Sequence, residues 1–249
     1  MTTPNDYYVH TEHYTSWHLT TDLTGMAPVY DNIDLRHRAY NPLLPDEFWI
    51  MSCNTASECY SVGSEDEDRI PKEVNGIPVY PMFRGGKTTY HGPGQMTVLM
   101  ILDGKRLLSQ RDPGIQVAEF INVSIFEAIK EYALERFNIE LHYRNDDPGL
   151  YTNAGAKISS TGFDVRGHHY FYSYNINLST DLSKYEDIAV CGVRGRVMGN
   201  LITDRKVDDA ETFAESEILL PKIWRRLYHR ADRILRWPDT ALEGTPVQI

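Results

Sequence analysis

The chain has 249 residues, 41% of them hydrophobic, and a formal net charge of -10. This balance is ordinary for one globular domain, and it argues against general binding to nucleic acid or to anionic membrane surfaces, which requires positive potential. No apolar run approaches the roughly 20 residues of a membrane span, and an odd count of three cysteines without framework spacing indicates a reducing compartment. We therefore expect a single cytoplasmic domain over residues 1–249, with a core over about 30–240 and a polar arm over 1–25.

The residue patterns, taken in chain order, predict strands over residues 47–54, 77–83, 96–102, 139–143, 150–153, 156–165 and 170–178. The run MTVLMIL at 96–102 is continuously apolar, which is typical of a buried strand. Helices are predicted over about 116–137 and 214–237. Apolar residues recur near helical spacing along the first of them, namely Phe120, Ile121, Ile125, Ile129, Tyr132 and Leu134. Adjacent strands combined with two long helices favour an α+β fold, a mixed and largely antiparallel sheet flanked by helices.

The segment RGGKTTYHGPGQ at residues 84–95 contains four glycines, and its Gly86-Lys87-Thr88 is similar to the end of a phosphate-binding loop. Such a loop needs a glycine five positions before that ending. This chain has Pro81 there, which has no N–H to offer a phosphate. A buried-strand pattern, not a helix, follows the segment. Its glycines instead let the backbone approach a ligand closely, or simply form a tight turn between two strands.

Several further motifs follow this segment in a definite order. DPGLYTN lies at residues 147–153, GAKISSTG lies at 155–162, and Cys191-Gly192 follows, with Cys191 34 positions after Lys157. Over roughly residues 47–200 these motifs resemble the octanoyl-[acyl-carrier-protein]:protein octanoyltransferases, also called lipoate–protein ligase B. The resemblance implies a biotin/lipoate protein ligase-like fold.

The resemblance also implies a reaction. Cys191 is the family's acyl-accepting nucleophile and Lys157 activates it, since an adjacent ammonium favours the thiolate. Cys191 is expected to take an octanoyl group from octanoyl-acyl carrier protein and to pass it to a lysine of a lipoyl domain. No ATP and no metal are implied, because the carrier protein supplies the acyl-pantetheine arm. Judged alone, Cys191 would be interpreted as a buried structural cysteine, the commonest state of a lone cysteine.

The implied partners are acyl carrier protein and the lipoyl domains of 2-oxoacid dehydrogenases and of the glycine-cleavage H-type protein, without nucleic acid or membrane. Three segments are expected to bind substrate, with the residues Arg84, Gly85, Gly86, Lys87, Thr88, Thr89, Tyr90 and His91, then Ser160, Thr161 and Gly162, then Ser173, Tyr174 and Asn175. His91 is either a hydrogen-bonding group of the wall or a satisfied histidine within a sheet.

Two stretches depart from the family pattern. Residues 52–63 lack the family's Glu-His-x-Pro and keep only the trailing Gly63. Residues 172–175 read Tyr-Ser-Tyr-Asn where the family has His-Gly-Leu/Phe-Ala. Two tyrosines there are expected to narrow or repolarise the pocket, which leaves the chain length and the acyl donor open. An amidotransferase acting between lipoyl-bearing proteins, an inactive binding module and an ATP-dependent ligase are the alternatives.

An acidic chain with acidic partners requires a local basic patch for docking. One candidate is the second helix, whose basic residues over 221–237 are Lys222, Arg225, Arg226, Arg230, Arg233 and Arg236. The other candidate follows the predicted nucleophile and comprises Arg194, Arg196, Arg205 and Lys206. Solvated arginines on an amphipathic helix are the simpler interpretation of the first.

Overall fold

A computed structural model of the chain describes residues 7–10, 15–20, 46–53, 57–64, 71–82, 84–108, 117–144, 147–189 and 195–228. Its centre is an eight-stranded sheet in the order β1-β2-β3-β8-β12-β11-β10-β9, in which only β2 and β3 pair in parallel. The strands are β1 (Tyr7–His10), β2 (Thr15–Thr20), β3 (Asp46–Ser52), β8 (Gln95–Asp103), β9 (Leu141–Tyr143), β10 (Gly149–Thr152), β11 (Lys157–Arg166) and β12 (His169–Asn177).

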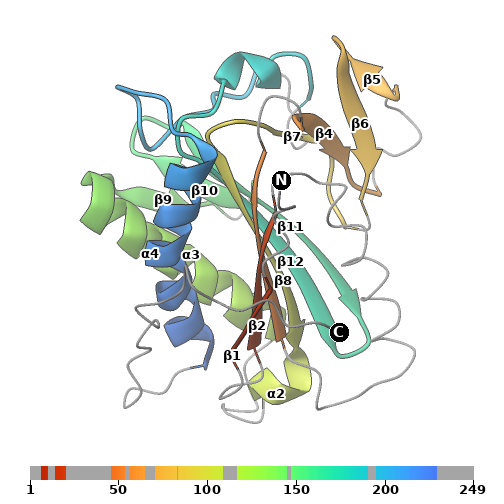
Figure 1. The fold of residues 1–249 in the computed structure, drawn as a ribbon, viewed down its shortest axis with the longest axis vertical. Coiled ribbons are helices and arrows are strands. Elements are labelled where there is room, and N and C mark those ends of the chain that lie inside the picture. The colour runs from red at the N-terminus through yellow and green to blue at the C-terminus, as the bar shows by residue number, and fades with distance from the viewer. Residues whose placement is uncertain are drawn as a thin grey trace.

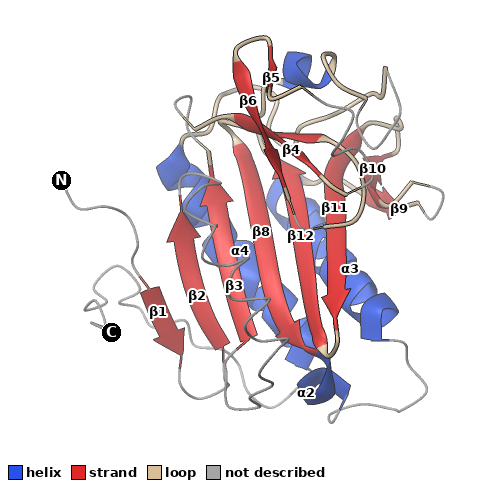
Figure 2. Cartoon of the chain, turned by 90° about the vertical axis from the view of Figure 1, so that its right-hand side faces the viewer, coloured by secondary structure: helices blue, strands red, loops and turns tan. Residues whose placement is uncertain are grey.

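The sheet separates two different layers. The long helices α3 (Val117–Phe137) and α4 (Asp209–Tyr228) lie on one face, and a small second sheet lies on the other (Figures 1 and 2). The small sheet has the order β5-β6-β4-β7, with β4 (Cys59–Val62), β5 (Glu73–Val74), β6 (Ile77–Pro81) and β7 (Thr89–His91). The short helix α2 (Gly104–Leu108) follows β8, and the 3-10 helix η3 (Leu182–Tyr185) follows β12. The predicted mixed, largely antiparallel sheet flanked by helices is confirmed.

β8 is buried along its whole length because both faces of the sheet are covered. Its even-numbered apolar residues, such as Val98 and Met100, pack in the cluster that contains α3 and α4. Its odd-numbered Leu99 and Ile101 pack on the opposite face with Trp49. The prediction of a buried strand from the run MTVLMIL is therefore confirmed.

The two helices pack against each other, and each differs from its prediction at one point. α3 buries Ile121, Ile125 and Ile129, but Leu134 is 48% exposed because Ala133 takes its expected place in the core. α4 begins at Asp209, before the predicted residue 214, since Asp208 caps it by accepting a hydrogen bond from the Glu211 amide at 2.8 Å. The predicted continuation beyond Tyr228 lies outside the described residues.

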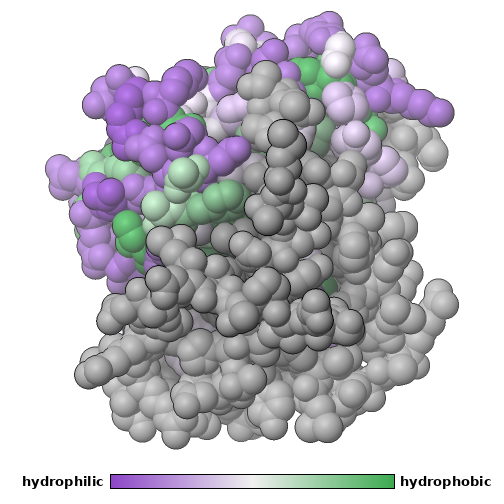
Figure 3. Space-filling view, in the orientation of Figure 1, coloured by the Kyte–Doolittle hydropathy of each residue, from purple (hydrophilic) through white to green (hydrophobic). Residues whose placement is uncertain are grey.

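The exposed side chains over the small sheet and along the outer ends of the helical layer are mostly hydrophilic (Figure 3). No helix in the described ranges is long and apolar enough to cross a membrane.

Candidate active site

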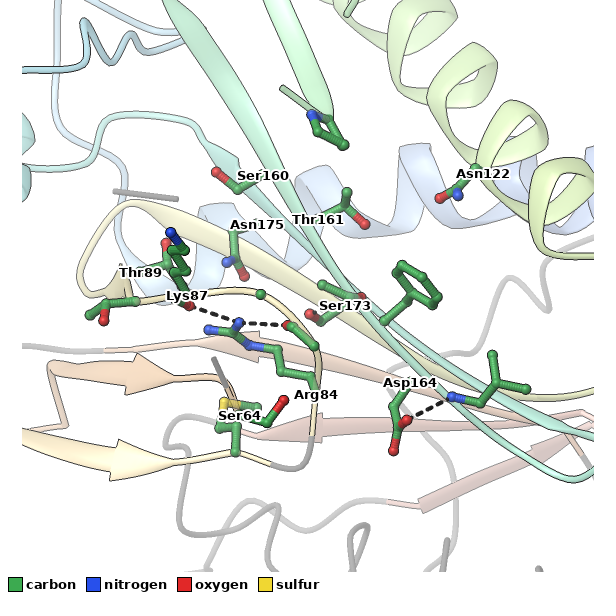
Figure 4. A pocket seen from close by; sticks show the side chains of 18 of the residues that line it. Ser64, Arg84, Lys87, Thr89, Asn122, Ser160, Thr161, Asp164, Ser173 and Asn175 are labelled. Atoms are coloured by element: carbon green, nitrogen blue, oxygen red, sulfur yellow. Dashed lines mark hydrogen bonds between the residues drawn. The ribbon is translucent and has the colours of Figure 1, made fainter. Parts of the chain in front are cut away.

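A cavity of about 800 Å³ lies between the glycine segment and β11. It is lined by most of the residues expected to bind substrate, namely residues 84–89 and 160–162 together with Ser173 and Asn175. Figure 4 shows Arg84 and Lys87 on the loop side of this space and Ser160 and Ser173 on the strand side. The structure thus brings together three sequence segments that the motifs alone left separate.

The loop wall is built around the guanidinium of Arg84, which is only 6% exposed. Its Nη1 donates to the carbonyl oxygens of Lys87 (2.9 Å) and Gly85 (3.2 Å), and its Nη2 donates to the Ser61 carbonyl oxygen (3.2 Å) and hydroxyl (3.0 Å). The aliphatic part of Arg84 crosses Gly162, where a Cβ atom would lie 2.6 Å from Arg84 Cδ. Arg84 therefore shapes the wall by holding its own loop against β11.

His91 does not line the cavity but lies fully buried behind the loop. Its Nδ1 is 3.1 Å from Gln95 Oε1 and its Nε2 is 2.8 Å from Ser61 Oγ. Gln95 Oε1 can only accept, so we assign the proton to Nδ1, and the Ser61 hydroxyl donates to the unprotonated Nε2. Burial and the nearby Arg84 charge lower the pKa of His91 to about 3, against an opposing contribution from Gln95. His91 is thus the satisfied, neutral sheet histidine of the two alternatives.

Tyr90 also lies outside the cavity wall, in β7. Its side chain is fully buried and its hydroxyl donates to Glu58 Oε2 at 2.7 Å. Burial, with the Glu58 carboxylate, raises the pKa of Tyr90 far above its ordinary value. Tyr90 and His91 therefore support the loop from behind, while residues 84–89 face the space.

The two tyrosines of β12 do not narrow the cavity, which was one of the two effects expected from the sequence. Successive residues of a strand point to opposite faces, and Tyr172 and Tyr174 point to the helical layer, where their hydroxyls donate to Ala118 O at 3.1 Å and to Asn122 Oδ1 at 2.8 Å. Ser173 and Asn175 are the residues of this segment that face the cavity. The departure from the family pattern therefore makes the cavity floor more polar without filling it with rings.

A β-bulge determines where Lys157 points. Leu150 pairs with Ser159 while Tyr151 pairs with Lys157, so Ile158 is an extra residue in β11. Leu150 packs in the helical core, which places Ser159 on that face and Lys157 on the opposite face, the face of Ser160. Without the bulge, Lys157 would share the face of Ser159.

The Lys157 side chain is completely buried, and its Nζ donates to Asp147 Oδ1 at 2.9 Å. Asp147 itself lines the cavity, and its other oxygen, Oδ2, forms an ion pair with Arg196. The space for the lysine exists because residue 149 is glycine: a Cβ atom there would lie 2.5 Å from Lys157 Cε. Asp147 was not among the residues expected at the site, although its Asp-Pro-Gly motif was the available signal.

Cys191, the predicted nucleophile, lies outside the described residues. The segment that follows it is described and runs beside Lys157, whose amide donates to Val197 O at 2.9 Å and whose carbonyl oxygen accepts from the Gly199 amide at 2.9 Å. The other two cysteines, Cys53 and Cys59, are buried free thiols. Within the described ranges, no group of three or more His, Cys, Asp or Glu side chains could hold a metal ion.

The hydroxyls of Thr88 and Thr89 are buried at the cavity wall and have no hydrogen-bond partner among the residues that the structure describes. Buried hydroxyls are normally satisfied by protein, water or ligand. These two hydroxyls are therefore suited to the polar groups of a bound molecule.

The basic residues predicted to dock a partner are largely neutralised within the chain. Glu131 accepts from Lys222, Arg225 and Arg226 at 2.7–2.8 Å. Burial would raise the pKa of Glu131, but these hydrogen bonds outweigh it and lower the pKa to about 2. Arg205 pairs with Glu211, Lys206 donates to Ser179 O and Arg196 pairs with Asp147. Arg194, Arg230, Arg233 and Arg236 lie outside the described residues.

Comparison with known proteins decides the family. Residues 30–213 match the model of the lipoyl protein ligase A/B catalytic domain. The chain belongs to this family. Among curated relatives, the octanoyltransferase of Actinobacillus pleuropneumoniae serotype 5b (strain L20) is 31% identical over 74% of this chain and 79% of its own. The octanoyltransferase of Laribacter hongkongensis is 31% identical over 74% of this chain and 82% of its own length. The predicted family and its acyltransferase class are confirmed.

Solved structures of the lipoyl protein ligase A/B family share the fold. Lipoate-protein ligase A bound with ATP superposes with a TM-score of 0.56 at 15% identity, over 85% of this chain and 83% of that one. A chain from the structure of a bi-partite lipoate protein ligase and its E2 lipoyl domain from Thermoplasma acidophilum gives a TM-score of 0.57 at 16% identity, over 88% and 85%. The predicted lipoate-ligase-like fold is therefore confirmed.

Proposed function

We propose that this chain is an octanoyltransferase that moves an octanoyl group from octanoyl-acyl carrier protein, through a thioester on Cys191, to a lysine of a lipoyl domain. The observation that carries the proposal is the buried Lys157, which the bulge turns to the cavity face and which pairs with the segment following Cys191. Relatives that are named octanoyltransferases cover most of the chain. Lipoyl domains of 2-oxoacid dehydrogenases and of the glycine-cleavage type are the acceptors.

The reaction balances with one proton shuttled by Lys157. The Cys191 thiolate attacks the thioester carbonyl, the bond to the pantetheine sulfur breaks, and the leaving thiolate takes a proton from the Lys157 ammonium. The acceptor amine then attacks the acyl-Cys191 carbonyl and gives a proton to the neutral Lys157. An amide forms, and Cys191 leaves as a thiolate. The thiolate and ammonium are thereby restored without ATP.

The cavity supports an acyl-pantetheine guest. Its volume of about 800 Å³ lies within the range of small-molecule sites. Thr88 and Thr89 offer hydroxyls to the amides of the arm, and Arg84 keeps their loop in place. The polar floor at Ser173 and Asn175 distinguishes this chain from the small residues that its family resemblance leads us to expect there.

The test is detection of the acyl-enzyme by intact-mass measurement after mixing with octanoyl-acyl carrier protein. We expect one added octanoyl group, located on Cys191 by peptide mapping. Cys191→Ala should give neither the adduct nor transfer, whereas Cys53→Ala, the matched control at a buried thiol, should keep both. Wild-type transfer by Cys191→Ala would overturn the proposed route, and tight carrier binding without any adduct would identify a binding module.

An ATP-dependent ligase is the second candidate, because the fold neighbours include a ligase bound with ATP. Free octanoate with ATP should give no octanoylated lipoyl domain if the donor is a thioester. Octanoylation under those conditions would favour the ligase. Offering an octanoylated lipoyl protein in place of the carrier tests the amidotransferase alternative in the same assay.

A further inference from the structure

Asp147 holds two cations from different parts of the chain. Its Oδ1 accepts from Lys157 Nζ at 2.9 Å, and its Oδ2 pairs with Arg196. The three side chains are 13%, 0% and 11% exposed. We propose that Asp147 and Arg196 act as positioning residues that set the charge of Lys157, Asp147 favouring the ammonium and Arg196 limiting that preference. This inference rests on the proposed role of Lys157 as the proton carrier of Cys191.

The ammonium group of Lys157 is buried and needs a compensating charge. A charged lysine without exposure to water is costly unless an anion compensates it. Asp147 supplies that anion at hydrogen-bond distance, which favours the charged form of Lys157. A charged Lys157 is the form that stabilises a neighbouring thiolate and that can protonate the leaving pantetheine sulfur.

Lys157 must also be able to release its proton during the reaction. A carboxylate bound to Lys157 alone would hold the ammonium strongly, whereas the reaction requires the lysine to become neutral between the two half-reactions. Arg196 pairs with the other oxygen of the same carboxylate and adds a positive charge that does not titrate near neutral pH. Arg196 therefore weakens the hold of Asp147 on the proton of Lys157.

Two further groups complete the surroundings of Lys157 in the described part of the chain. The Tyr151 hydroxyl can donate to Asp147 Oδ2 and to the Asp147 carbonyl oxygen, the latter at 3.0 Å, and it accepts from Arg196 at 3.2 Å. Lys157 Nζ lies 5.4 Å from the Tyr151 ring centroid. Arg144 lies 5.0 Å from the same ring centroid. These contacts fix the orientation of the carboxylate, so that each oxygen keeps its own cation.

The experiment measures the single-turnover rate of acyl-enzyme formation from octanoyl-acyl carrier protein as a function of pH. The quantity compared between wild type and variants is the pH at which the rate falls on the alkaline side of this profile, where Lys157 loses its proton. Asp147→Asn removes a negative charge beside Lys157 and should move this alkaline limb to lower pH by about one unit. Arg196→Gln removes a positive charge and should move the limb to higher pH. Asp147→Glu should restore the wild-type limb. Arg136→Gln, which removes a half-exposed arginine paired with Glu215 in the helical layer, is the matched control and should leave the limb unmoved.

The direction of the shifts separates this proposal from a purely structural role. Loss of rate without a shift in either variant, or shifts in the same direction, would overturn it. If Asp147→Asn fails to fold, Arg196→Gln alone tests the proposal, since the alkaline limb of its pH–rate profile must move to higher pH. Wild-type transfer by Cys191→Ala would instead reject the proposed function, independently of the two limbs.

Discussion

Protonation of His91 should destabilise the protein at mildly acidic pH. The buried ring accepts from Ser61 at Nε2 and donates to Gln95 at Nδ1, so the folded state holds it neutral with a pKa of about 3. In the unfolded chain the His91 ring binds a proton near pH 6.5. The contribution of the neutral His91 to the free energy of unfolding is therefore fully present above that pH and is lost as the pH falls toward 3. The linkage relation then gives a loss of about 2 kcal/mol between about pH 7.5 and pH 5.

For a chain of this size, that loss corresponds to a decrease in Tm of about 4–8 °C. Thermal unfolding followed by circular dichroism at both pH values checks it in wild type and in His91→Gln. Other histidines and the carboxylates titrate in both proteins, so the difference between their pH dependences isolates His91. His142→Gln, at an exposed histidine, should behave as wild type. Equal losses in wild type and His91→Gln, or a His91 ring that titrates near pH 6.5 by NMR, would refute the reasoning.

Three further predictions concern two close contacts and one ion-pair cluster. Gly149→Ala places a Cβ atom 2.4 Å from the Ser159 carbonyl oxygen and 2.5 Å from Lys157 Cε, so the β10–β11 pairing and the lysine must both shift. It should slow acyl-enzyme formation in single turnovers by about 100-fold. Gly162→Ala places one 2.6 Å from Arg84 Cδ, and should lower the free energy of unfolding in urea by about 1–3 kcal/mol. Glu131→Gln should cost about 1 kcal/mol at neutral pH. Because its folded pKa is lowered to about 2, that deficit should shrink as the pH falls below about 4.5.

Elements whose signal is local were predictable from the sequence. The apolar run of β8 and the helical spacing along α3 both arise from burial within the element itself, and their observed bounds differ from the predicted ones by one residue at most. The predicted start of α4 is too late because Asp208 and the acidic residues after it are polar and show no apolar periodicity, although they cap and begin the helix.

The face of the sheet to which a side chain points, and the ion pairs between residues far apart in the chain, were not predictable in the same way. The direction of Tyr172 and Tyr174 depends on the register of β12 against its neighbours, which the alternation of residue types does not specify. The Asp147–Arg196 pair joins positions far apart in the chain, and neither residue belongs to a motif that anticipates the other. A strand and not a helix follows the glycine segment, as the sequence predicts, but the dependence of its loop on the Arg84 guanidinium could not be read from the residue pattern.

The bulge at Ile158 makes the site depend on how β11 pairs with β10 as well as on the identity of its residues. Lys157 keeps the cavity face because it pairs with Tyr151 while Ile158 is left out of the ladder. Closing the bulge with the number of residues unchanged would restore strict alternation and turn the lysine toward the helical core, with every motif still present. Deletion of Ile158 would instead make Lys157 and Ser159 direct neighbours on opposite faces and leave the lysine on the cavity face. Homologues of this chain should therefore have either the bulge or a gap at the residue after the lysine.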